Sequence, residues 1–419
     1  MNSLTISLEK IDTSIAEYTE KEKKRLMLSI GLIASENIVS QEVLEAQGSV
    51  FINKYAEGYP DRRYYGGCQY ADAIENIAML RLKNIFNAKY VNVQAHSGSQ
   101  ANQAVFFSLL EYGDKIMSLS LNSGGHLSHG TKINVSGKLF NVQHYNVDQD
   151  NNLINYDDIR KLVIEEEPKM LIAGTSSYSR KINFQKFKEI ANTINCLLLA
   201  DIAHISGLVT TRFHQNPLPH AHIITSTTHK TLRGPRGGII MSNHKTIIDK
   251  INTAIFPGIQ GGPSIHTIAA KAVSFYEAMQ PKFQQYIKQV ILNSQCLTKV
   301  IKNRGYTILT DGTDNHLLVV DLRQQNINGK DAEISLEKSG IICNKNCVPF
   351  DHKTPFLTSG IRLGTASCTS RGFREKEFFL IGHLIATILD NLNTQDTLDV
   401  ETLVSKKVAH ICKSFPTHA

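Results

Sequence analysis

The sequence predicts an α/β fold, and three observations support this prediction. Between about residues 90 and 245, short apolar runs alternate with segments whose apolar residues have helical spacing. The runs are apolar throughout, which is typical of strands covered on both faces in a largely parallel sheet. The chain has 419 residues, 42% of them hydrophobic and 20% charged, with a mean hydropathy of −0.18. This profile is typical of a globular protein with two or three domains, since a domain has roughly 100 to 200 residues.

The expected strands of this sheet follow one another along the middle of the chain. They cover residues 91–94, 115–119, 170–173, 196–201, 223–225 and 238–241. Apolar runs of this length, separated by helix-length segments, indicate parallel strands joined by crossover helices. We therefore expect one α/β domain in this region.

The pattern changes downstream, where a smaller α+β unit is expected. The elements predicted there are a helix over 264–279 that Pro281 interrupts, a second helix to about Lys302, strands over 316–322 and 361–364, and a late helix with Phe378, Ile381, Ile385, Ile388 and Leu392 on one side. At the other end of the chain, Ile11, Ile15 and Tyr18 have helical spacing. The basic run 21–25 that follows them is typical of the solvated side of a helix.

Composition and charge exclude several classes of protein. The seven cysteines are odd in number and form no CxxC pair, so neither a disulfide framework nor a typical zinc site is expected. The longest apolar run, 196–209, is interrupted by Asp201 and His204 and is shorter than the ~20 residues that cross a bilayer. The N-terminus lacks the basic and apolar regions of a secretory signal, so we expect a reducing, cytoplasmic location. The net charge of +7 permits nucleic-acid binding, but no aromatic-rich basic patch favours it.

A first candidate site follows the strand expected to end at Gln94. The string His96-Ser-Gly-Ser-Gln-Ala-Asn102 predicts a turn that opens into a helix. Its hydroxyls and backbone N–H groups would lie at the positive end of that helix, which is a favourable place for a phosphate. An ordinary serine helix cap is the alternative, and taken alone it is the better one.

Two further candidates follow neighbouring strands. Asp201 closes the strand 196–201, and Lys230 follows the next strand after one crossover, so both are expected at the carboxyl edge where α/β sheets bind ligands. A buried carboxylate needs a cationic partner, and a lysine among threonine hydroxyls and a histidine suits a Schiff-base nucleophile. Singly, a capping aspartate and a solvated lysine are the plainer interpretations. Together with the phosphate seat, the pair matches what pyridoxal phosphate requires.

Seven strings in the same order resemble the serine hydroxymethyltransferase family, which uses pyridoxal phosphate and has fold type I. They are LIASEN (32–37), NKYAEGYPDRRYYGG (53–67), HSGSQAN (96–102), GGHLSHG (124–130), STTHKTLRGPRGG (226–238), PGIQGGP (257–263) and SGIRLGT (359–365). The resemblance implies a large domain with a mostly parallel seven-stranded sheet between helices, a smaller C-terminal α+β domain and an N-terminal helical arm. The implied boundaries are 1–50 for the arm, 51–280 for the large coenzyme-binding domain and 281–419 for the small domain.

The resemblance also implies roles around the coenzyme. Lys230 would bind it covalently, with Thr227 and His229 tuning the reaction, and Asp201 would keep the ring nitrogen protonated. His126 would stack on the ring and His204 would lie near its phenolic oxygen, although core or turn histidines are the alternative. The remaining coenzyme contacts implied are Ser97, Gly98, Ser99 and Ser176, joined from the partner subunit of a homodimer by Tyr55, Gly261 and Gly262.

Substrate contacts follow from the same resemblance. Arg362 would hold the amino-acid carboxylate with help from Ser35 and Tyr65, and Glu57 would exchange a proton near the substrate hydroxyl. The tetrahydrofolate pocket implied is lined by Tyr64, Leu121, Gly125, His126, Leu127, Asn346, Thr354, Pro355 and Phe356. Outside the motifs, a surface charge, a surface glutamate and plain core leucines are the alternatives for these residues.

The implied reaction moves the hydroxymethyl group of L-serine to tetrahydrofolate and leaves glycine, with no metal. Four departures stand out: Ala95 and Ala366 replace frequent prolines, and Ser123 and Phe350 replace polar residues near the presumed folate side. The last two concern folate affinity more than activity. A folate-independent aldolase for β-hydroxy amino acids remains an alternative with the same lysine, acid and phosphate seat. A nucleic-acid-binding protein that kept the fold without catalysis is the alternative from another class.

Overall fold

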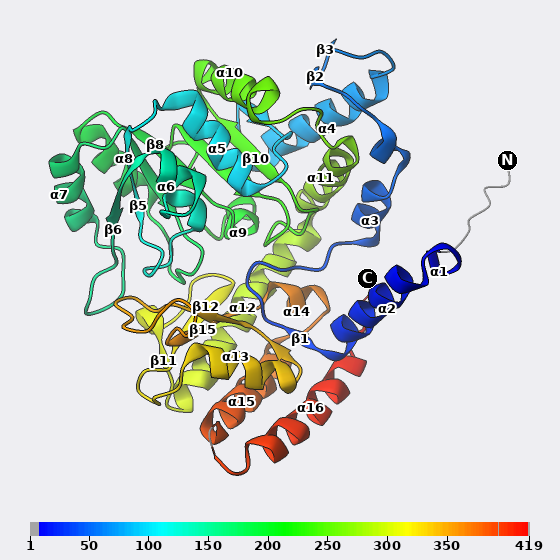
Figure 1. Ribbon diagram of the computed structural model, residues 1–419, viewed down its shortest axis with the longest axis vertical. Coiled ribbons are helices and arrows are strands. Elements are labelled where there is room, and N and C mark those ends of the chain that lie inside the picture. The colour runs from blue at the N-terminus through cyan, green and yellow to red at the C-terminus, as the bar shows by residue number, and fades with distance from the viewer. Residues whose placement is uncertain (1–7, 393, 418–419) are drawn as a thin grey trace.

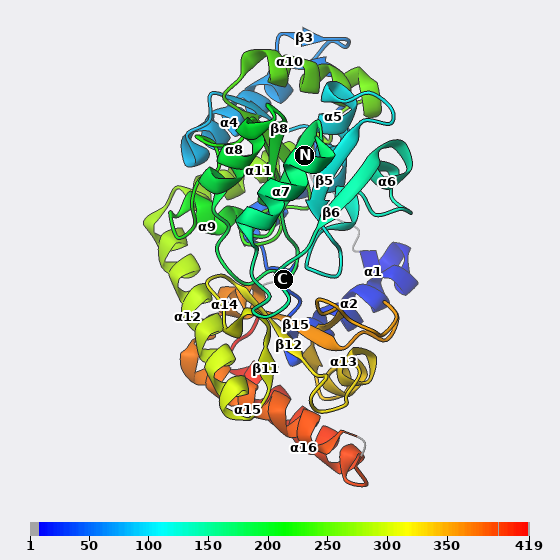
Figure 2. The ribbon, with the colours of Figure 1, turned by 90° about the vertical axis from the view of Figure 1, so that its left-hand side faces the viewer.

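The computed structural model describes residues 8–392 and 394–417. Figure 1 shows two parts stacked along the long axis, the upper one built on a large sheet and the lower one containing the C-terminal helices. The helix α12 (Pro281–Asn303) runs from one part into the other (Figure 2). Its first half contributes Phe283 and Ile287 to the core of the upper part, and its second half contributes Leu297 and Ile301 to the core of the lower part.

The upper part contains the predicted seven-stranded sheet, in the order β4-β10-β9-β8-β7-β5-β6. The strands are β4 (Tyr90–Asn92), β5 (Lys115–Leu119), β6 (Asn141–Tyr145), β7 (Met170–Gly174), β8 (Leu197–Asp201), β9 (Ile223–Thr227) and β10 (Gly238–Ser242). All pairs are parallel except those of β10, which runs antiparallel to both β4 and β9. The α/β class and the mostly parallel sheet are therefore confirmed.

Strand β6 was not among the strands expected from the sequence. It lies at the edge of the sheet, and its residues NVQHY are mostly polar and partly exposed, with only Tyr145 buried. An edge strand is not covered on both faces, so it lacks the continuous apolar run by which its neighbours were predicted. The predicted strand 91–94 is shorter at its end, because the ladder with β10 stops at Asn92.

Helices cover both faces of this sheet. On one face α4 (Gln69–Phe86), α7 (Tyr156–Glu166), α8 (Phe184–Thr193), α9 (Ser206–Thr210) and α11 (Ile265–Ala278) share a core with alternate strand residues such as Leu198 and Ile224. On the other face α5 (Gly98–Leu109) and α10 (Lys245–Thr253) pack on Leu199 and Ile223. The short helix α6 (Val135–Leu139) precedes β6. Burial on both faces explains why most residues of β7 and β8 are apolar.

The lower part is the expected α+β unit. Its antiparallel sheet has the order β11-β12-β15-β14, formed by β11 (Thr307–Ile308), β12 (Leu317–Asp321), β14 (Asn344–Asn346) and β15 (Gly360–Gly364). The helices α13 (Gly329–Lys338), α14 (Ala366–Ser370), α15 (Glu375–Asn391) and α16 (Thr397–Lys413) complete it. Phe378, Ile381 and Ile385 face the core as their helical spacing predicted.

The N-terminal segment packs on the lower part and is hydrogen-bonded to it. After α1 (Leu8–Ile11) and α2 (Thr13–Leu28), strand β1 (Ile30–Gly31) pairs in parallel with β13 (Ile341–Ile342). The Arg371 guanidinium donates to the carbonyl oxygens of Leu26, Met27 and Ser29, which satisfies acceptors at the end of α2. On the outer side of the arm Ile11 and Tyr18 are 71% and 68% exposed, so its apolar stripe is uncovered within one chain.

The short elements between arm and sheet complete the large part. They are α3 (Gln41–Gln47), the 3₁₀ turn η1 (Val50–Asn53), β2 (Gly58–Tyr59) and β3 (Arg62–Arg63). Across residues 8–392 and 394–417, no helix has both the length and the apolar character needed to cross a membrane.

Candidate active site

The candidate residues meet at the carboxyl ends of the central strands. In the parallel register Asp201 at the end of β8 lies opposite Gly174 at the end of β7 and Thr225 in β9. Ser176 follows β7, and Lys230 follows β9. Parallel strands present their carboxyl ends at one edge of a sheet, so the order of elements alone gathers these residues.

Asp201 is the buried anion of this edge. Its Oδ2 accepts hydrogen bonds from His129 Nε2 at 2.8 Å and Asn102 Nδ2 at 2.9 Å, and its Oδ1 accepts one from the Ala203 N–H at 3.0 Å. Burial opposes the charge of Asp201, but the hydrogen bond from His129 and the nearby histidines hold the pKa of this carboxyl well below its usual value. Asp201 is therefore a fixed negative charge.

Lys230 is 7% exposed and lies in the field of Asp201 and Arg362. Burial is the main cause that lowers its pKa to about 8, assisted by the positive charges of Arg362 and Arg236 and opposed by Asp201. A lysine with this pKa is partly a neutral amine near neutral pH, which is the nucleophilic form. On one side of it, Thr227 Oγ1 donates to the Ala203 carbonyl at 3.3 Å.

The turn before α5 has the features of both a serine helix cap and a phosphate site, the two interpretations that its sequence allowed. The Ser97 hydroxyl accepts from the Gln100 N–H at 3.1 Å and so caps the helix. The N–H groups of Gly98 and Ser99 in the first turn have no acceptor among the described residues. A Cβ on Gly98 would lie 2.6 Å from Thr227 Cγ2, so the turn packs directly on the end of β9, beside Lys230.

Three histidines around the lysine are held neutral. Burial lowers the pKa of His126 to about 4 and that of His229 to about 3, the second with help from the Lys230 charge. His126 Nδ1 lies 2.7 Å from the Ser128 hydroxyl and accepts from the Ser128 N–H. Burial also places the pKa of His204 well below its usual value, and its ring stacks on that of His316, 5.5 Å away.

Arg362 lies in strand β15 of the small antiparallel sheet, and its side chain reaches the strand-end residues of the large sheet. Its Nε donates to Asn344 Oδ1 at 3.1 Å and its Nη1 to the Ser176 carbonyl at 2.8 Å, while Nη2 has no acceptor in the described part of the chain. Burial lowers the pKa of Arg362 to about 10, so the guanidinium is charged at neutral pH. The segment with Ser35 runs beside β15, where the Gly364 N–H donates to the Leu32 carbonyl at 2.7 Å.

A second group of predicted residues gathers around Glu57. The Tyr65 hydroxyl donates to Glu57 Oε2 at 3.2 Å, and the rings of Tyr55 and Tyr65 meet edge to face at 5.4 Å. A Cβ on Gly262 would lie 3.1 Å from the Tyr55 ring, and one on Gly261 would lie 3.3 Å from Glu57. The Glu57 charge, through a direct Coulomb effect and this hydrogen bond, raises the pKa of Tyr65.

The residues expected to contact folate are largely solvent-accessible. Leu121 is 39% exposed, Leu127 47% and Phe356 82%, and Tyr64 at 73% packs edge to face on Phe256. Thr354 and Pro355 beside Phe356 are also exposed, whereas Asn346 is half-buried. Gly125 is tightly placed, since a Cβ there would lie 2.1 Å from the Leu119 carbonyl oxygen.

Two of the four departures have a structural consequence. Ser123 is buried and its hydroxyl donates to Asn146 Oδ1 at 3.1 Å, so its polarity serves the turn. Phe350 has a φ of +58°, a left-handed conformation that is unfavourable for a bulky side chain.

Sequence reasoning missed two residues that contact Asp201. Asn102 and His129 lie within the strings HSGSQAN and GGHLSHG, but no role was predicted for either. The side chain of His129 is 1% exposed, and the Asn102 amide also accepts from the Thr225 hydroxyl at 2.6 Å. The only sequence signal is their place in the motifs, because Asn102 and His129 are 99 and 72 positions away from Asp201 and reach it only on folding.

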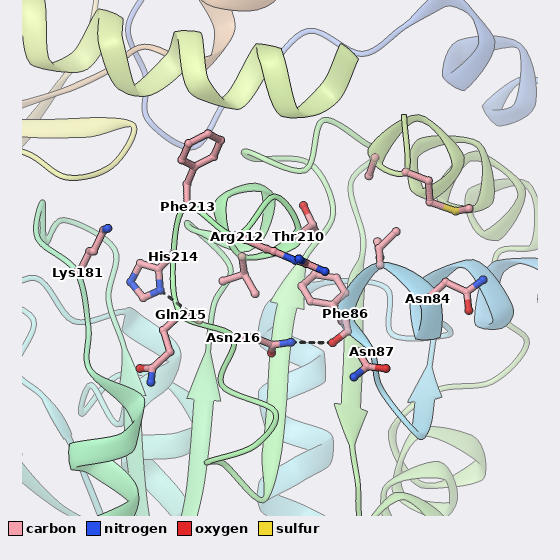
Figure 3. Close-up of a pocket in the computed structure, with 14 residues that line it drawn as sticks. Asn84, Phe86, Asn87, Lys181, Thr210, Arg212, Phe213, His214, Gln215 and Asn216 are labelled. Atoms are coloured by element: carbon pink, nitrogen blue, oxygen red, sulfur yellow. Dashed lines mark hydrogen bonds between the residues drawn. The ribbon is translucent and has the colours of Figure 1, made fainter. Parts of the chain in front are cut away.

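A cavity of about 760 Å³ lies elsewhere, between the end of α4, the loop after α9 and the end of α11. Figure 3 shows that polar side chains line it, among them Asn87, Lys181 and Arg212, and that Asn216 Nδ2 donates to the Phe86 carbonyl at 2.8 Å. None of the predicted site residues lines this cavity. The size of a cavity is therefore a poor guide to the active site here.

The strand-end residues fit pyridoxal phosphate in three respects. The Ser176 hydroxyl and His229 Nδ1 are buried polar atoms with no partner in the described structure, and each needs one. The free N–H groups of Gly98 and Ser99 suit a phosphate at the start of a 12-residue helix. Asp201 is a fixed negative charge, which suits a protonated pyridine nitrogen.

Known proteins resemble this chain over nearly its whole length. A family model described as serine hydroxymethyltransferase matches residues 8–385. The probable serine hydroxymethyltransferase of Rickettsia bellii (strain RML369-C) is 56% identical over 417 residues, which cover 99% of each chain. The serine hydroxymethyltransferases of Rickettsia typhi (strain ATCC VR-144 / Wilmington) and Rickettsia massiliae (strain Mtu5) are 56% and 55% identical over the same length.

Proposed function

The chain belongs to the serine hydroxymethyltransferase family, and from this premise we propose that Lys230, Asp201 and Arg362 form the centre of its active site. The reaction is the reversible transfer of the hydroxymethyl group of L-serine to tetrahydrofolate, which gives glycine and 5,10-methylenetetrahydrofolate. The enzyme depends on pyridoxal phosphate. The observation that carries the assignment of residues is the buried lysine beside a fixed carboxylate at one sheet edge.

Pyridoxal phosphate, when bound, supplies an electron-withdrawing ring that accepts the charge left when the bond from Cα to the hydroxymethyl carbon breaks. The chain would hold its phosphate with the Gly98 and Ser99 N–H groups and the Ser97 turn, its ring nitrogen with Asp201, and its ring with His126. Ser176 and His204 would lie at the phenolic side. Lys230 would hold its aldehyde carbon, since a partly neutral amine can attack.

The neutral histidines and Thr227 would set the proton balance around the lysine. With pKa values of about 4 and 3, His126 and His229 carry no charge at neutral pH and do not repel the Lys230 amine. His229 Nδ1 is free to donate or accept a hydrogen bond. The charges that act on Lys230 are then those of Asp201, Arg362 and Arg236.

Arg362 would orient the amino acid. Its Nε and Nη1 are anchored by Asn344 and Ser176, so the guanidinium plane is fixed, and Nη2 remains for a carboxylate. Ser35 and Tyr65 would add hydrogen bonds to the same carboxylate. Glu57 would take and return the proton of the serine hydroxyl, and the exposed leucines 121 and 127 would contact the pteridine together with Tyr64, Gly125, Asn346, Thr354, Pro355 and Phe356.

We also propose that the active enzyme is a homodimer with shared sites. The group around Glu57 is exposed, with Tyr55 at 58%, and lies beside an uncovered apolar surface that includes Val50 at 80% and Ile52 at 61%. Exposed apolar side chains that gather on one surface are typical of a protein interface, and α2 adds an uncovered stripe of its own. A second copy that covered it would bring Tyr55, Glu57 and Gly262 to the strand-end residues of its partner.

Mixing two inactive variants tests the dimer. Lys230→Ala inactivates the part of a site that lies at the strand ends. Glu57→Gln inactivates the part that the partner subunit would contribute. After unfolding and refolding together in equal amounts, shared sites predict recovery of about a quarter of wild-type activity, because half the dimers are mixed and each has one intact site. Activity that stays at the level of the separate variants would contradict shared sites.

A visible spectrum tests the site itself. Purified wild-type protein loaded with pyridoxal phosphate should show the absorption of covalently bound coenzyme, and Lys230→Ala should not. Exchange of the glycine α-proton should depend on tetrahydrofolate, whereas a folate-independent aldolase would show no dependence.

We further propose a cytoplasmic location, supported by seven cysteines that all remain unpaired, and fractionation of cells tests it.

The division into an arm (1–50), a large domain (51–280) and a small domain (281–419) is also proposed. Two separate hydrophobic cores support two domains, but the change between them falls within α12, because Phe283 and Ile287 still pack in the core of the large domain and Leu297 packs in that of the small domain. Ile30 and Leu32 of the arm pack in the core of the small domain. Limited proteolysis would test whether cleavage falls at these boundaries.

A further inference from the structure

Lys271 is a buried lysine that the proposed mechanism does not use. It lies in the middle of α11 with 1% of its surface exposed. Its ammonium donates to the carbonyl oxygens of Val93 at 2.6 Å, Gly238 at 2.9 Å and Ala95 at 3.0 Å. An ammonium has three donors, so each one is used.

The three carbonyl oxygens need a cation between them. Carbonyl dipoles that converge on one point repel one another, and their arrangement resembles the way proteins bind monovalent cations. The carboxylate that acts on this ammonium is Glu75, which accepts from Gln94 Nε2 at 2.8 Å, and Gln94 lies between Val93 and Ala95 in the chain. Burial lowers the pKa of Lys271, whereas Glu75 and hydrogen bonds to three carbonyl oxygens favour the charged form. A neutral amine would leave one carbonyl without a donor.

These carbonyls belong to the segments that form the phosphate turn. Val93 and Ala95 lie between β4 and the turn, and one residue, His96, separates Ala95 from Ser97. The Ala95 carbonyl also accepts from the Gly238 N–H at 2.9 Å, so Lys271 joins the approach to the turn with the start of β10.

The same region is packed without spare room. A Cβ on Gly238 would lie 2.3 Å from the Ser97 carbonyl oxygen, and a Cβ on Gly237 would lie 2.4 Å from Lys271 Cε. The start of β10 therefore packs tightly against Lys271 on one side and against the turn of residues 95–99 on the other. A displacement of the Lys271 head group would be passed on to Ser97 and Gly98.

We propose that Lys271 is a positioning residue of the coenzyme site, whose ammonium acts as a built-in monovalent cation that holds the 95–99 turn in the shape that receives the phosphate. The proposal rests on the phosphate seat described under the proposed function. A residue that only filled space in α11 would stabilise the fold without favouring a ligand that carries phosphate.

Two ligands separate these roles. Pyridoxal 5′-phosphate and pyridoxal differ only in the phosphate, and binding of each to coenzyme-free protein is measured by its visible absorption. We expect Lys271→Ala and Lys271→Met to weaken binding of pyridoxal 5′-phosphate at least about tenfold and to change binding of pyridoxal by less than about twofold. Leu297→Ala, in the core of the small domain, is the matched destabilising control and should weaken neither ligand selectively.

Rescue by small cations supplies a second readout. Lys271→Ala leaves the space of the stem and head group, so ammonium or propylammonium chloride should restore affinity for pyridoxal 5′-phosphate. Sodium chloride at equal ionic strength should restore less affinity, because sodium is a smaller cation than ammonium and the three carbonyl oxygens are spaced for a nitrogen at 2.6, 2.9 and 3.0 Å. Lys271→Met keeps the stem space filled and should not respond to either salt.

Equal weakening of both ligands, or an unchanged preference for the phosphorylated ligand, would overturn the proposal. If the Lys271 variants do not fold, Gly237→Ala displaces the head group while keeping the charge, and it should reduce the same preference. A preference that stays at the wild-type value in Gly237→Ala would also overturn it. If wild-type protein itself binds pyridoxal as tightly as pyridoxal 5′-phosphate, the phosphate seat is wrong, which is a separate outcome.

Discussion

Replacement of Arg362 tests how the chain recognises its amino-acid substrate. The guanidinium is anchored through Nε to Asn344 and through Nη1 to the Ser176 carbonyl, at 3.1 and 2.8 Å. A carboxylate bound by two charge-assisted hydrogen bonds gains about 1.5–3 kcal/mol from each. Loss of both therefore predicts that Arg362→Ala lowers kcat/KM for L-serine by about 10² to 10⁴-fold, at 1.4 kcal/mol for each factor of ten.

Arg362→Lys is the more discriminating change. A lysine keeps the charge, but one ammonium cannot replace the Nε and Nη1 anchors and bind the carboxylate in a fixed plane. We expect a decrease of about 10 to 10²-fold in kcat/KM, mainly through KM. The measurement is the steady-state rate against serine concentration at saturating tetrahydrofolate.

Two controls accompany this comparison. The affinity for pyridoxal phosphate should change by less than about twofold, and the melting temperature should fall by no more than about 3 °C, since Ser176 is only partly buried. A wild-type KM in Arg362→Lys would refute the assignment. A variant that loses the coenzyme and not the affinity for serine would refute it as well.

Three further predictions follow from single contacts. Gly98→Ala places a Cβ 2.6 Å from Thr227 Cγ2 and should weaken pyridoxal phosphate binding about tenfold, measured by spectral titration; unchanged binding would mean that the turn can shift. His129→Leu should lower the free energy of unfolding by about 2–4 kcal/mol at neutral pH, because Asp201 loses a buried hydrogen-bond donor. The depressed pKa of Asp201 stabilises the folded wild type above the unfolded-state pKa of about 3.9, and this stabilisation is lost as the pH falls. The difference from wild type, measured by urea titration, should therefore shrink below about pH 4, and a constant difference would argue against this pairing. Phe350→Asn should raise the free energy of unfolding by about 0.5–1 kcal/mol, because asparagine tolerates a φ of +58° better, and a lower melting temperature would show that the phenyl ring stabilises the fold.

The strands of the large sheet illustrate what could be predicted. A strand covered on both faces is mostly apolar, as MLIAG in β7 and LLLAD in β8 show, whereas the buried strand β9, IITST, carries three hydroxyl residues. The edge strand β6 carries no such pattern, and the antiparallel direction of β10 depends on its pairing with β4 and β9. Local patterns report burial, but they do not report which strands become neighbours.

The active-site residues divide in the same way. Lys230 and Asp201 were predicted, because each follows a strand and the edge of a parallel sheet gathers such residues. His129 and Lys271 were not, since their importance comes from contacts with Asp201 and with the carbonyls of Val93, Ala95 and Gly238. A side chain that acts through a partner distant in the chain leaves no pattern of its own.

By itself, therefore, the sequence determined the α/β class and the residue types that coenzyme chemistry requires, because strand periodicity and motif chemistry are local properties. Only the tertiary structure decided how the Asp201 charge is held, how Arg362 is anchored and which carbonyl oxygens Lys271 contacts. The physical reason is that hydrogen bonds, burial and the pKa values they set depend on distances between segments, and these distances exist only in the folded chain.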